Sequence, residues 1–163
     1  MKKSGRIKKI DVINFLEESN NIEGVFDPDS LKQAMYAWEY IKKVKKISSQ
    51  DILKLHKILM LNQELRPSEK GYFRRVEVMI AGRLGATWKI VPELTAQWCD
   101  IANKPMNDLE IRECHVKFEK IHPFVDGNGR TGRILLNWQR LINKLPILVI
   151  KDSEKLTYYK WFE

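Results

Sequence analysis

The amino-acid sequence predicts a mainly α-helical fold in one domain, with a single β-hairpin. Three segments with helical spacing of apolar residues precede Pro67. The spacing changes to an alternation of two between Gly71 and Pro92, and helical spacing resumes after it. Apolar residues make up 44% of the 163 positions, and the chain has no internal repeat and no glycine-, serine- or proline-rich linker. Residues 1–163 are therefore expected to share one core.

The first three helices are predicted from their ends and their apolar faces. The first helix starts at about Asp11 and ends at Gly24, a residue suited to a helix C-terminus. Asp29 or Ser30 opens the second helix, and Ser48 or Ser49 caps the third. The apolar faces of the second and third helices comprise Leu31, Ala34, Met35, Trp38 and Ile41, and Ile52, Leu55, His56, Leu59 and Met60.

Residues 71–90 are predicted to form the hairpin. The alternating apolar residues are Phe73, Val76, Val78 and Ile80, and Gly82 and Gly85 can supply a turn. A lone hairpin is marginally stable, so it must pack on a surface or receive another strand. Two interpretations stay open: a flap whose edge docks a partner chain, or a connector packed on the helices.

Helical spacing resumes in residues 91–102, 108–121 and 130–143, and a short helix follows from Ser153. Cys99 and Cys114 are expected to be reduced structural thiols, not metal ligands. The side chains expected in packing or hydrogen bonding are those of Trp38, Trp98, Trp138, His56 and His115.

The formal net charge is +8, which fits an anionic partner such as nucleic acid, a membrane surface or a nucleotide. The lysine clusters are Lys2, Lys3, Lys8 and Lys9, and Lys42, Lys43, Lys45 and Lys46. Aromatic residues do not interleave with these lysines, so a solvated basic face is favoured over a nucleic-acid groove. The sequence has neither an apolar run of membrane-spanning length nor a signal-peptide pattern. A cytoplasmic location without membrane association is expected.

The chemistry is concentrated in residues 122–133, with the sequence HPFVDGNGRTGR. Pro123 disfavours a helical conformation at His122, so the preceding helix should end there and free the imidazole. Gly127 and Gly129 allow the backbone to approach a ligand closely. The free N–H groups at the start of the next helix form an anion site.

The charged side chains of this segment fit a polyphosphate and a metal ion. Arg130 and Arg133 are three residues apart, so on a helix they share a face and can reach one polyphosphate. Asp126 supplies an oxygen ligand suited to Mg²⁺. His122 is the group of this segment that titrates near neutral pH, which suits a general base acting on a hydroxyl.

This segment resembles the signature HxFx(D/E)GNGRxxR of the Fic family, with every defining position filled, and the resemblance extends from about residue 10 to 160. It implies a mainly helical Fic fold with a β-hairpin flap. The implied activity is the transfer of AMP from ATP, with Mg²⁺, to a Tyr, Thr or Ser hydroxyl of a target protein. The target would dock on the flap residues Val78, Met79 and Ile80, and self-modification and a homo-oligomer are compatible with this.

The resemblance assigns a role to each residue of the segment. It makes His122 the base that deprotonates the target hydroxyl and Asp126 the magnesium ligand, and it places Phe124 in the core. The nucleotide-binding set comprises the amides of Gly127 and Gly129, Asn128 at the α-phosphate, Arg130 at the β-phosphate and Arg133 at the γ-phosphate.

Residues 19–24, SNNIEG, lie at the end of the first predicted helix. Ser19 and Glu23 project together there, and a glutamate at a helix C-terminus gains from a cationic partner. A solvated carboxylate at a surface helix end is the alternative. The hexad resembles the (S/T)xxxE(G/N) inhibitory motif of Fic proteins. This implies that residues 10–24 are an inhibitory helix in which Glu23 pairs with Arg133 and ATP binds misaligned.

Three other activities remain as alternatives. The Doc branch, which transfers phosphate, carries Lys where this chain has Gly129, so the glycine favours AMP transfer. The reverse reaction, in which Glu23 positions water to remove AMP from a target, belongs to the same fold. A non-enzymatic nucleic-acid-binding module is disfavoured because His122, Asp126, Arg130 and Arg133 are all present.

Overall fold

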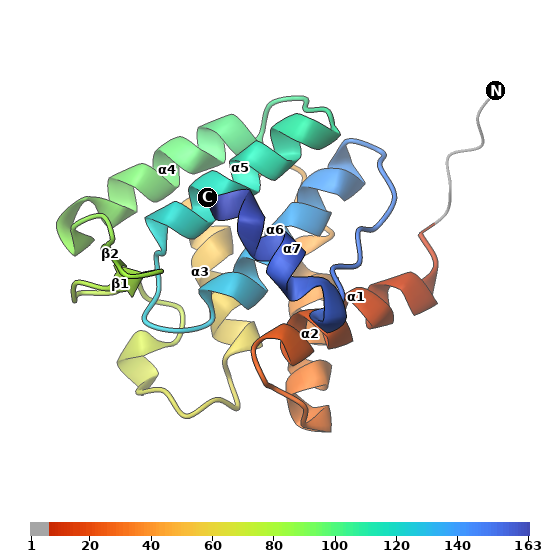
Figure 1. Ribbon diagram of the computed structural model, residues 1–163, viewed down its shortest axis with the longest axis horizontal. Helices are drawn as coiled ribbons and strands as arrows, with labels where there is room; N and C mark the ends of the chain where they lie inside the picture. The colour runs from red at the N-terminus through yellow and green to blue at the C-terminus, as the bar shows by residue number, and fades with distance from the viewer. Residues whose placement is uncertain (1–6) are drawn as a thin grey trace.

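The computed structural model describes residues 7–163, which form seven α-helices and one two-stranded hairpin (Figure 1). The helices are α1 (Lys9–Ile22), α2 (Pro28–Ile41), α3 (Ser49–Leu59), α4 (Val91–Ala102), α5 (Asp108–Ile121), α6 (Asn128–Ile142) and α7 (Lys155–Tyr159). The strands are β1 (Met79–Ile80) and β2 (Arg83–Leu84), and short 3₁₀ turns occupy Pro67–Glu69, Trp88–Ile90, Asp152–Glu154 and Lys160–Phe162. Lys2 and Lys3 of the expected basic cluster lie outside the described residues. The prediction of a mainly helical fold with one hairpin is confirmed.

Side-chain caps determine where several helices begin. Ser48 caps α3 through a reciprocal pair of hydrogen bonds with Asp51. Asp27 caps α2 by accepting from the N–H of Ser30 at 2.8 Å, and Pro28 occupies the first turn. The predicted start of α2 at Asp29 or Ser30 is therefore one or two residues late, because the first-turn proline belongs inside the helix.

Two other helix boundaries differ from the prediction. Helix α1 begins at Lys9, two residues before the predicted start, and ends as expected where Gly24 adopts a positive φ of 69°. Helix α6 begins at Asn128, two residues before Arg130, because Gly127 has a left-handed conformation and ends the preceding turn. The functional segment therefore includes the first turn of α6.

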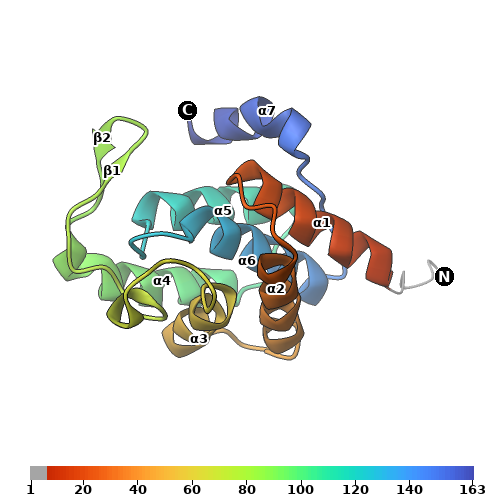
Figure 2. The same ribbon diagram turned by 90° about the horizontal axis from the view of Figure 1, so that it is seen from below.

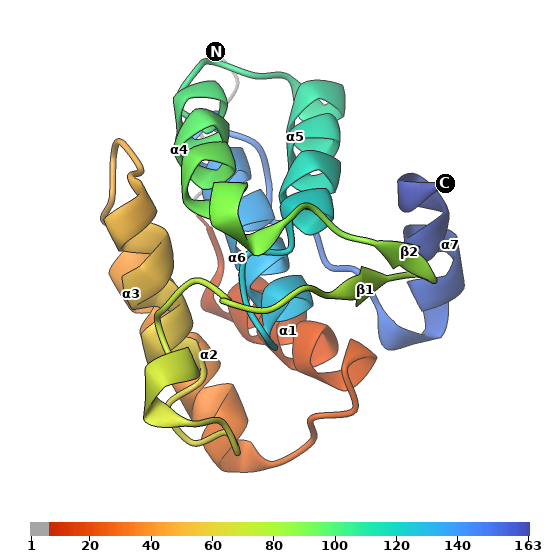
Figure 3. The same ribbon diagram turned by 90° about the vertical axis from the view of Figure 1, so that its left-hand side faces the viewer.

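Helix α6 is the central helix of the bundle, and Figures 1 and 3 show it among the other helices. All residues from Arg130 to Arg140 are buried. Polar side chains on such a helix need partners inside the protein. Asn137, for example, exchanges two hydrogen bonds with the backbone of Leu148, which fastens the segment between α6 and α7. The central position of α6 fixes the place of its N-terminus.

The core contains the aromatic residues that the apolar patterns predict. Trp38, Trp98 and Trp138 are buried, as are His56 and His115. The thiols of Cys99 and Cys114 are free and buried, which confirms the prediction of reduced structural cysteines. Among residues 7–163, no helix combines the length and the apolar character that crossing a bilayer requires.

The hairpin is shorter than the predicted alternation. Only Met79 with Leu84 and Ile80 with Arg83 pair across it, and Ala81 and Gly82 form the turn with positive φ at both positions. Gly85 lies outside the turn, where its N–H donates to the carbonyl of Val78 at 2.8 Å. The alternation before residue 78 does not form a strand. The hairpin stands on the same side of the molecule as α7, with a gap between the two ribbons (Figure 2).

Candidate functional site

His122 lies directly after α5 in a left-handed conformation, with φ 51° and ψ 63°. Its ring atom Nδ1 lies 3.3 Å from the carbonyl oxygen of Glu119. Because a carbonyl only accepts hydrogen bonds, Nδ1 carries the proton and Nε2 keeps its lone pair. Burial lowers the pKa of His122, so the imidazole is neutral at neutral pH. The side chain is therefore equipped to accept a proton at Nε2.

The turn after His122 is held by two buried side chains. Phe124 is fully buried and stacks on the ring of His56, with 3.7 Å between the centroids. The side chain of Asn128 accepts from the N–H of Phe124 and donates to its carbonyl, both at 2.9 Å. Sequence reasoning assigns Asn128 to a phosphate, whereas these bonds give it a second task, which is to close the turn.

Gly127 is required by the shape of this turn. Its φ is 81°, and a Cβ atom at this position would lie 2.6 Å from Sδ of Met60. It also precedes the first turn of α6, whose N–H groups have no partners within the helix. No side chain caps this end. Amides of this kind and the positive end of the helix dipole suit an anion, which is the site that the sequence predicts here.

Arg133 lies one helical turn further along α6 and is held by α1. Its Nε donates to Oγ of Ser19 at 2.8 Å, and its Nη2 donates to the carbonyl of Ser19 at 3.0 Å. Nη2 also pairs with Oε1 of Glu23 at 2.6 Å. A Cβ at Gly129 would lie 2.4 Å from the same Oε1, so the glycine makes room for this pair. The structure brings Ser19, Glu23 and Arg133 together.

Arg130 does not point toward the same partners as Arg133, although both lie on α6. Its Nη2 contacts Sδ of Met60 and lies 3.4 Å from the amide oxygen of Gln63. Nε and Nη1 are buried, and neither has a hydrogen-bond partner within residues 7–163. The two arginines are spaced three residues apart on α6, as expected. Their side chains nevertheless point to different partners.

Asp126 is exposed at the edge of the glycine turn, and its Oδ1 accepts from the N–H of Gly127 at 2.7 Å. Within residues 7–163, no three or more His, Cys, Asp or Glu side chains form a group that could hold a metal ion by itself. Mg²⁺ at nucleotide sites takes one or two carboxylates and completes its coordination with phosphates and water. A single carboxylate beside free amides fits that chemistry.

A cleft of about 920 Å³ opens between the hairpin, α7 and the ends of α5 and α6. Its walls include His122, Gly129 and Arg133, together with Glu23 from α1. Of the three predicted flap residues, Ile80 lines the cleft, whereas Met79 is exposed and Val78 lies at the hairpin base. The aromatic residues of the far wall are Tyr158, Tyr159 and Phe162.

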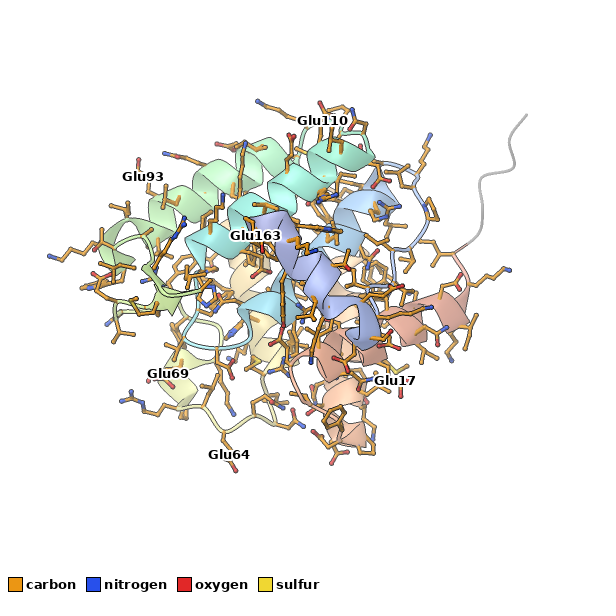
Figure 4. The ribbon with its side chains drawn as sticks, in the orientation of Figure 1. Glu17, Glu64, Glu69, Glu93, Glu110 and Glu163 are labelled. Carbon is orange, nitrogen blue, oxygen red and sulfur yellow. The ribbon has the colours of Figure 1, made fainter. Side chains whose placement is uncertain are left out.

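Glu119 is a cleft residue that sequence reasoning missed. Most acidic side chains project outward, as Glu64 and Glu93 do in Figure 4, but Glu119 is almost buried beside Gly132. Its Oε1 has no hydrogen-bond partner within the described chain. Burial raises the pKa of Glu119 to about 8, and the charge of Arg133 lowers it less. A glutamate between Phe118 and Lys120 on a predicted helix gives no signal for this placement.

Arg74 and His56 are also absent from the predicted site. The guanidinium of Arg74 is buried and donates to the carbonyl of His122 at 2.7 Å. Nε2 of His56 bonds to the carbonyl of Asp126 at 2.8 Å, and Nδ1 accepts from the N–H of Gly71 at 3.0 Å. Both side chains form hydrogen bonds with backbone atoms, and backbone atoms are the same in nearly every residue. The sequence therefore offered no pattern from which to find these contacts.

Comparison with known proteins agrees with the Fic fold and family that the sequence resembles. A family profile described as Fic/DOC family matches residues 46–139, more than half of the chain. The chain is 30% identical over 124 residues to protein adenylyltransferase Fic of Drosophila erecta and 31% identical to that of Drosophila virilis. These alignments cover 72% of this chain but only 24% and 25% of the two relatives, so the chain spans about a quarter of their length.

Solved structures resemble the chain over nearly its whole length. A Fic domain containing signaling protein from Bacteroides thetaiotaomicron has a TM-score of 0.79 at 20% identity, with coverage of 98% of this chain and 76% of that one. Fic-1 from C. elegans has a TM-score of 0.80 at 22% identity, with coverage of 95% and 55%. At these identities the likeness concerns the fold. With the profile match across residues 46–139, the chain belongs to the Fic/DOC family.

Proposed function

We propose that this chain transfers AMP from ATP to a hydroxyl group of a target protein, with His122 as the general base. The observation that carries the proposal is that His122, Gly129 and Arg133 line one cleft at the N-terminus of α6. A proton acceptor, a guanidinium and unpaired backbone amides meet there. This combination suits the transfer of a phosphate-linked group.

The reaction assigned to this cleft is a displacement at phosphorus. The target hydroxyl oxygen attacks the α-phosphorus of ATP and forms the new P–O bond. The bond between the α-phosphorus and the oxygen bridging to the β-phosphate breaks, and pyrophosphate leaves. Nε2 of His122 takes the hydroxyl proton, a contribution typically of about 10²–10⁴ in rate. The lowered pKa of His122 keeps Nε2 free for this at neutral pH.

Binding of the triphosphate is assigned to α6 and its preceding turn. The amides of the first turn and the guanidinium of Arg133 are donors for phosphate oxygens. The two unpaired nitrogens of Arg130 are further donors whose burial calls for a partner. Asp126 would hold Mg²⁺, which supplies positive charge against the phosphates when bound.

We assign α1 an inhibitory role because Glu23 occupies Arg133. Oε1 of Glu23 lies 2.6 Å from Nη2 of Arg133, the guanidinium that we assign to the γ-phosphate. Ser19 accepts from Nε through its hydroxyl and from Nη2 through its carbonyl. ATP bound beside this pair would lack the Arg133 contact and place its α-phosphate out of line with the target hydroxyl.

Two further features support AMP transfer to a protein over the alternatives. The curated relatives reported above are named protein adenylyltransferases. Gly129, where the phosphate-transferring branch has lysine, leaves room in the cleft beside Arg133. The target chain is assigned to the exposed hairpin edge, where Met79 and Leu84 project into solvent beside the cleft.

The test is intact-mass measurement of Glu23→Gly after incubation with ATP and Mg²⁺, alone and with lysate containing labelled ATP. We expect this variant to gain the mass of AMP on itself or to label a lysate protein at least about tenfold more than the unmodified chain. Glu17→Gly is the matched control, because Glu17 is exposed on the same helix (Figure 4) and the substitution loosens α1 without touching Arg133. His122→Ala in the Glu23→Gly background should bind ATP and transfer nothing.

Each outcome separates one part of the proposal. Equal transfer by Glu23→Gly and the unmodified chain would contradict the inhibitory role of α1. Gain of phosphate in place of AMP would assign the chain to the phosphotransferase branch. Loss of AMP from a modified target would point to the reverse reaction. Undiminished transfer by the His122→Ala variant would exclude His122 as the base.

A further inference from the structure

Arg74 is a fully buried cation whose guanidinium bonds are made to backbone carbonyls. Nε donates to the carbonyl of His122 at 2.7 Å, and Nη2 donates to that of Ile121 at 3.3 Å. Nη1 donates to the carbonyl of Val76 at 2.9 Å, and Nη2 also donates to that of Ala86 at 2.6 Å. The nearest carboxylate, Glu77, lies at 4.0 Å from Nη1. Carbonyl oxygens are thus the main partners of this charge.

The carbonyls bound by Arg74 belong to two separate parts of the site. Val76 precedes β1 and Ala86 follows β2, so the two are the roots of the hairpin. Ile121 and His122 are the end of α5 and the candidate base. The N–H of Arg74 adds a fifth bond, to the carbonyl of Pro123 at 2.9 Å. One residue therefore closes the hairpin at its base and fastens it to the His122 backbone.

The His122 backbone needs such a fastening. A left-handed conformation costs about 1–2 kcal/mol for a residue with a Cβ atom, and helices that end in this conformation usually place glycine there. A glycine would supply no imidazole. A residue held in a sparsely populated conformation persists only when its surroundings over-determine it. The short bond from Nε of Arg74 to the His122 carbonyl is one such determinant.

Burying the charged guanidinium of Arg74 costs free energy unless well-oriented acceptors pair with its N–H groups. Removing a guanidinium from water is unfavourable, and desolvation lowers the pKa of Arg74. A planar guanidinium can satisfy four carbonyls at fixed angles, whereas the single nitrogen of a lysine cannot. The requirement is therefore for the shape of arginine as well as for its charge.

We propose that Arg74 is a positioning residue, which holds the His122 backbone and the two roots of the hairpin in one fixed arrangement, so that a hydroxyl presented on the hairpin meets the imidazole. The assignment rests on the proposed function of this cleft. Arg74 acts through His122 and touches no reacting atom. Its effect is on the rate of transfer and not on the affinity for nucleotide.

The first test is Arg74→Lys in the Glu23→Gly background. We expect kcat for AMP transfer to fall about 100-fold, because small misplacements of reacting groups have effects of that size. The Kd for ATP should change by less than about threefold, because no phosphate-binding group is altered. Arg140→Lys is the matched control. Arg140 is also buried and donates to the carbonyl of Pro146, away from the cleft. It should lose stability and keep kcat within about threefold.

The second test uses the unaltered chain and needs neither a folded variant nor activity. Native-state hydrogen exchange should give similar protection to the N–H groups of Arg74, Gly85 and His122, within about threefold, because one guanidinium ties their segments together. If Gly85 exchanges more than about tenfold faster than His122, the hairpin root opens alone and the proposal is wrong.

The two tests separate failure of the inference from failure of the proposed function. Absence of transfer in the Glu23→Gly parent would contradict the function and leave the exchange result to decide on Arg74. Transfer by a folded Arg74→Lys variant at the parent rate would overturn the positioning role. An equal fall of kcat in the Arg74 and Arg140 variants would also overturn it, because the effect would then be one of stability.

Discussion

Oε1 of Glu23 and Nη2 of Arg133 lie 2.6 Å apart although 110 residues separate them in the chain. Arg133 is buried, and the carboxylate is its charged partner. The bond joins the C-terminal end of α1 to the central helix α6 at the edge of the cleft. The proposed restraint of α1 on AMP transfer therefore depends on a single ion pair with a small number of supporting bonds.

Ser19→Ala should weaken this restraint partially. The substitution removes the hydroxyl that accepts from Nε of Arg133 at 2.8 Å and leaves Glu23 in place. A hydrogen bond to a charged group contributes about 1.5 kcal/mol or more, so AMP transfer should rise about tenfold, and by less than in Glu23→Gly. Intact-mass kinetics measure this. Ser30→Ala, an equally buried serine on α2, should leave transfer unchanged. A Ser19→Ala variant as slow as the unmodified chain would contradict the prediction.

Phe124→Ala should destabilise the chain by about 3–5 kcal/mol, because the ring is fully buried and its loss leaves a cavity beside His56. Urea unfolding measures the free energy. The adjacent Val125 is exposed at the surface, so Val125→Ala is the control and should change stability by less than about 0.5 kcal/mol. Similar losses in both variants would mean that the ring does not hold the turn.

Gly127→Ala should lower stability for two separable reasons, which are a positive φ and a collision with Met60. Gly82 has a similar φ with open space around it, so Gly82→Ala should cost only the backbone part, about 1 kcal/mol. Adding Met60→Ala to Gly127→Ala should remove the collision but not the backbone part. Double-mutant unfolding free energies test this, and strictly additive effects would exclude the collision.

Glu119→Gln should remove a pH dependence of stability. The pKa of Glu119 rises from 4.5 to about 8 on folding, chiefly through burial. The folded chain therefore binds this proton more tightly than the unfolded chain, and its contribution to stability is lost as pH rises from 4.5 to about 8. Each pKa unit corresponds to about 1.4 kcal/mol, so the loss amounts to a few kcal/mol.

The measurement is the difference in unfolding free energy between the unmodified chain and Glu119→Gln across this pH range. Subtraction is needed because His56 and His115 have lowered pKa values of about 4 and about 3, caused mainly by burial. Their contributions are lost in the opposite direction, as pH falls below 6.5. Glu113→Gln, on the exposed side of α5, is the control. A flat difference for Glu119→Gln would show that its carboxyl is not buried in solution.

Local signals in the sequence determined the helices and the glycine turn. Helical spacing predicted α4 and α5 with their observed bounds, and Gly24 and Ser48 marked helix ends correctly. These signals need only neighbours within one or two turns, which the sequence contains. The prediction of an anion site in residues 122–133 rests on a signal of the same kind, because Gly127 and the first turn of α6 are adjacent in the chain.

The tertiary structure alone decided which distant groups meet. Arg74 reaches carbonyls of the hairpin and of α5, and backbone carbonyls are alike in every sequence. Arg130 turns to Met60 and Gln63, because packing against α3, and not helical spacing, sets the direction of its side chain. The pKa of Glu119 is raised mainly by burial, and the charges of Arg133 and Glu23, which are distant in the chain, also act on it. Burial and long-range contacts arise only when the helices pack, so no local pattern records them.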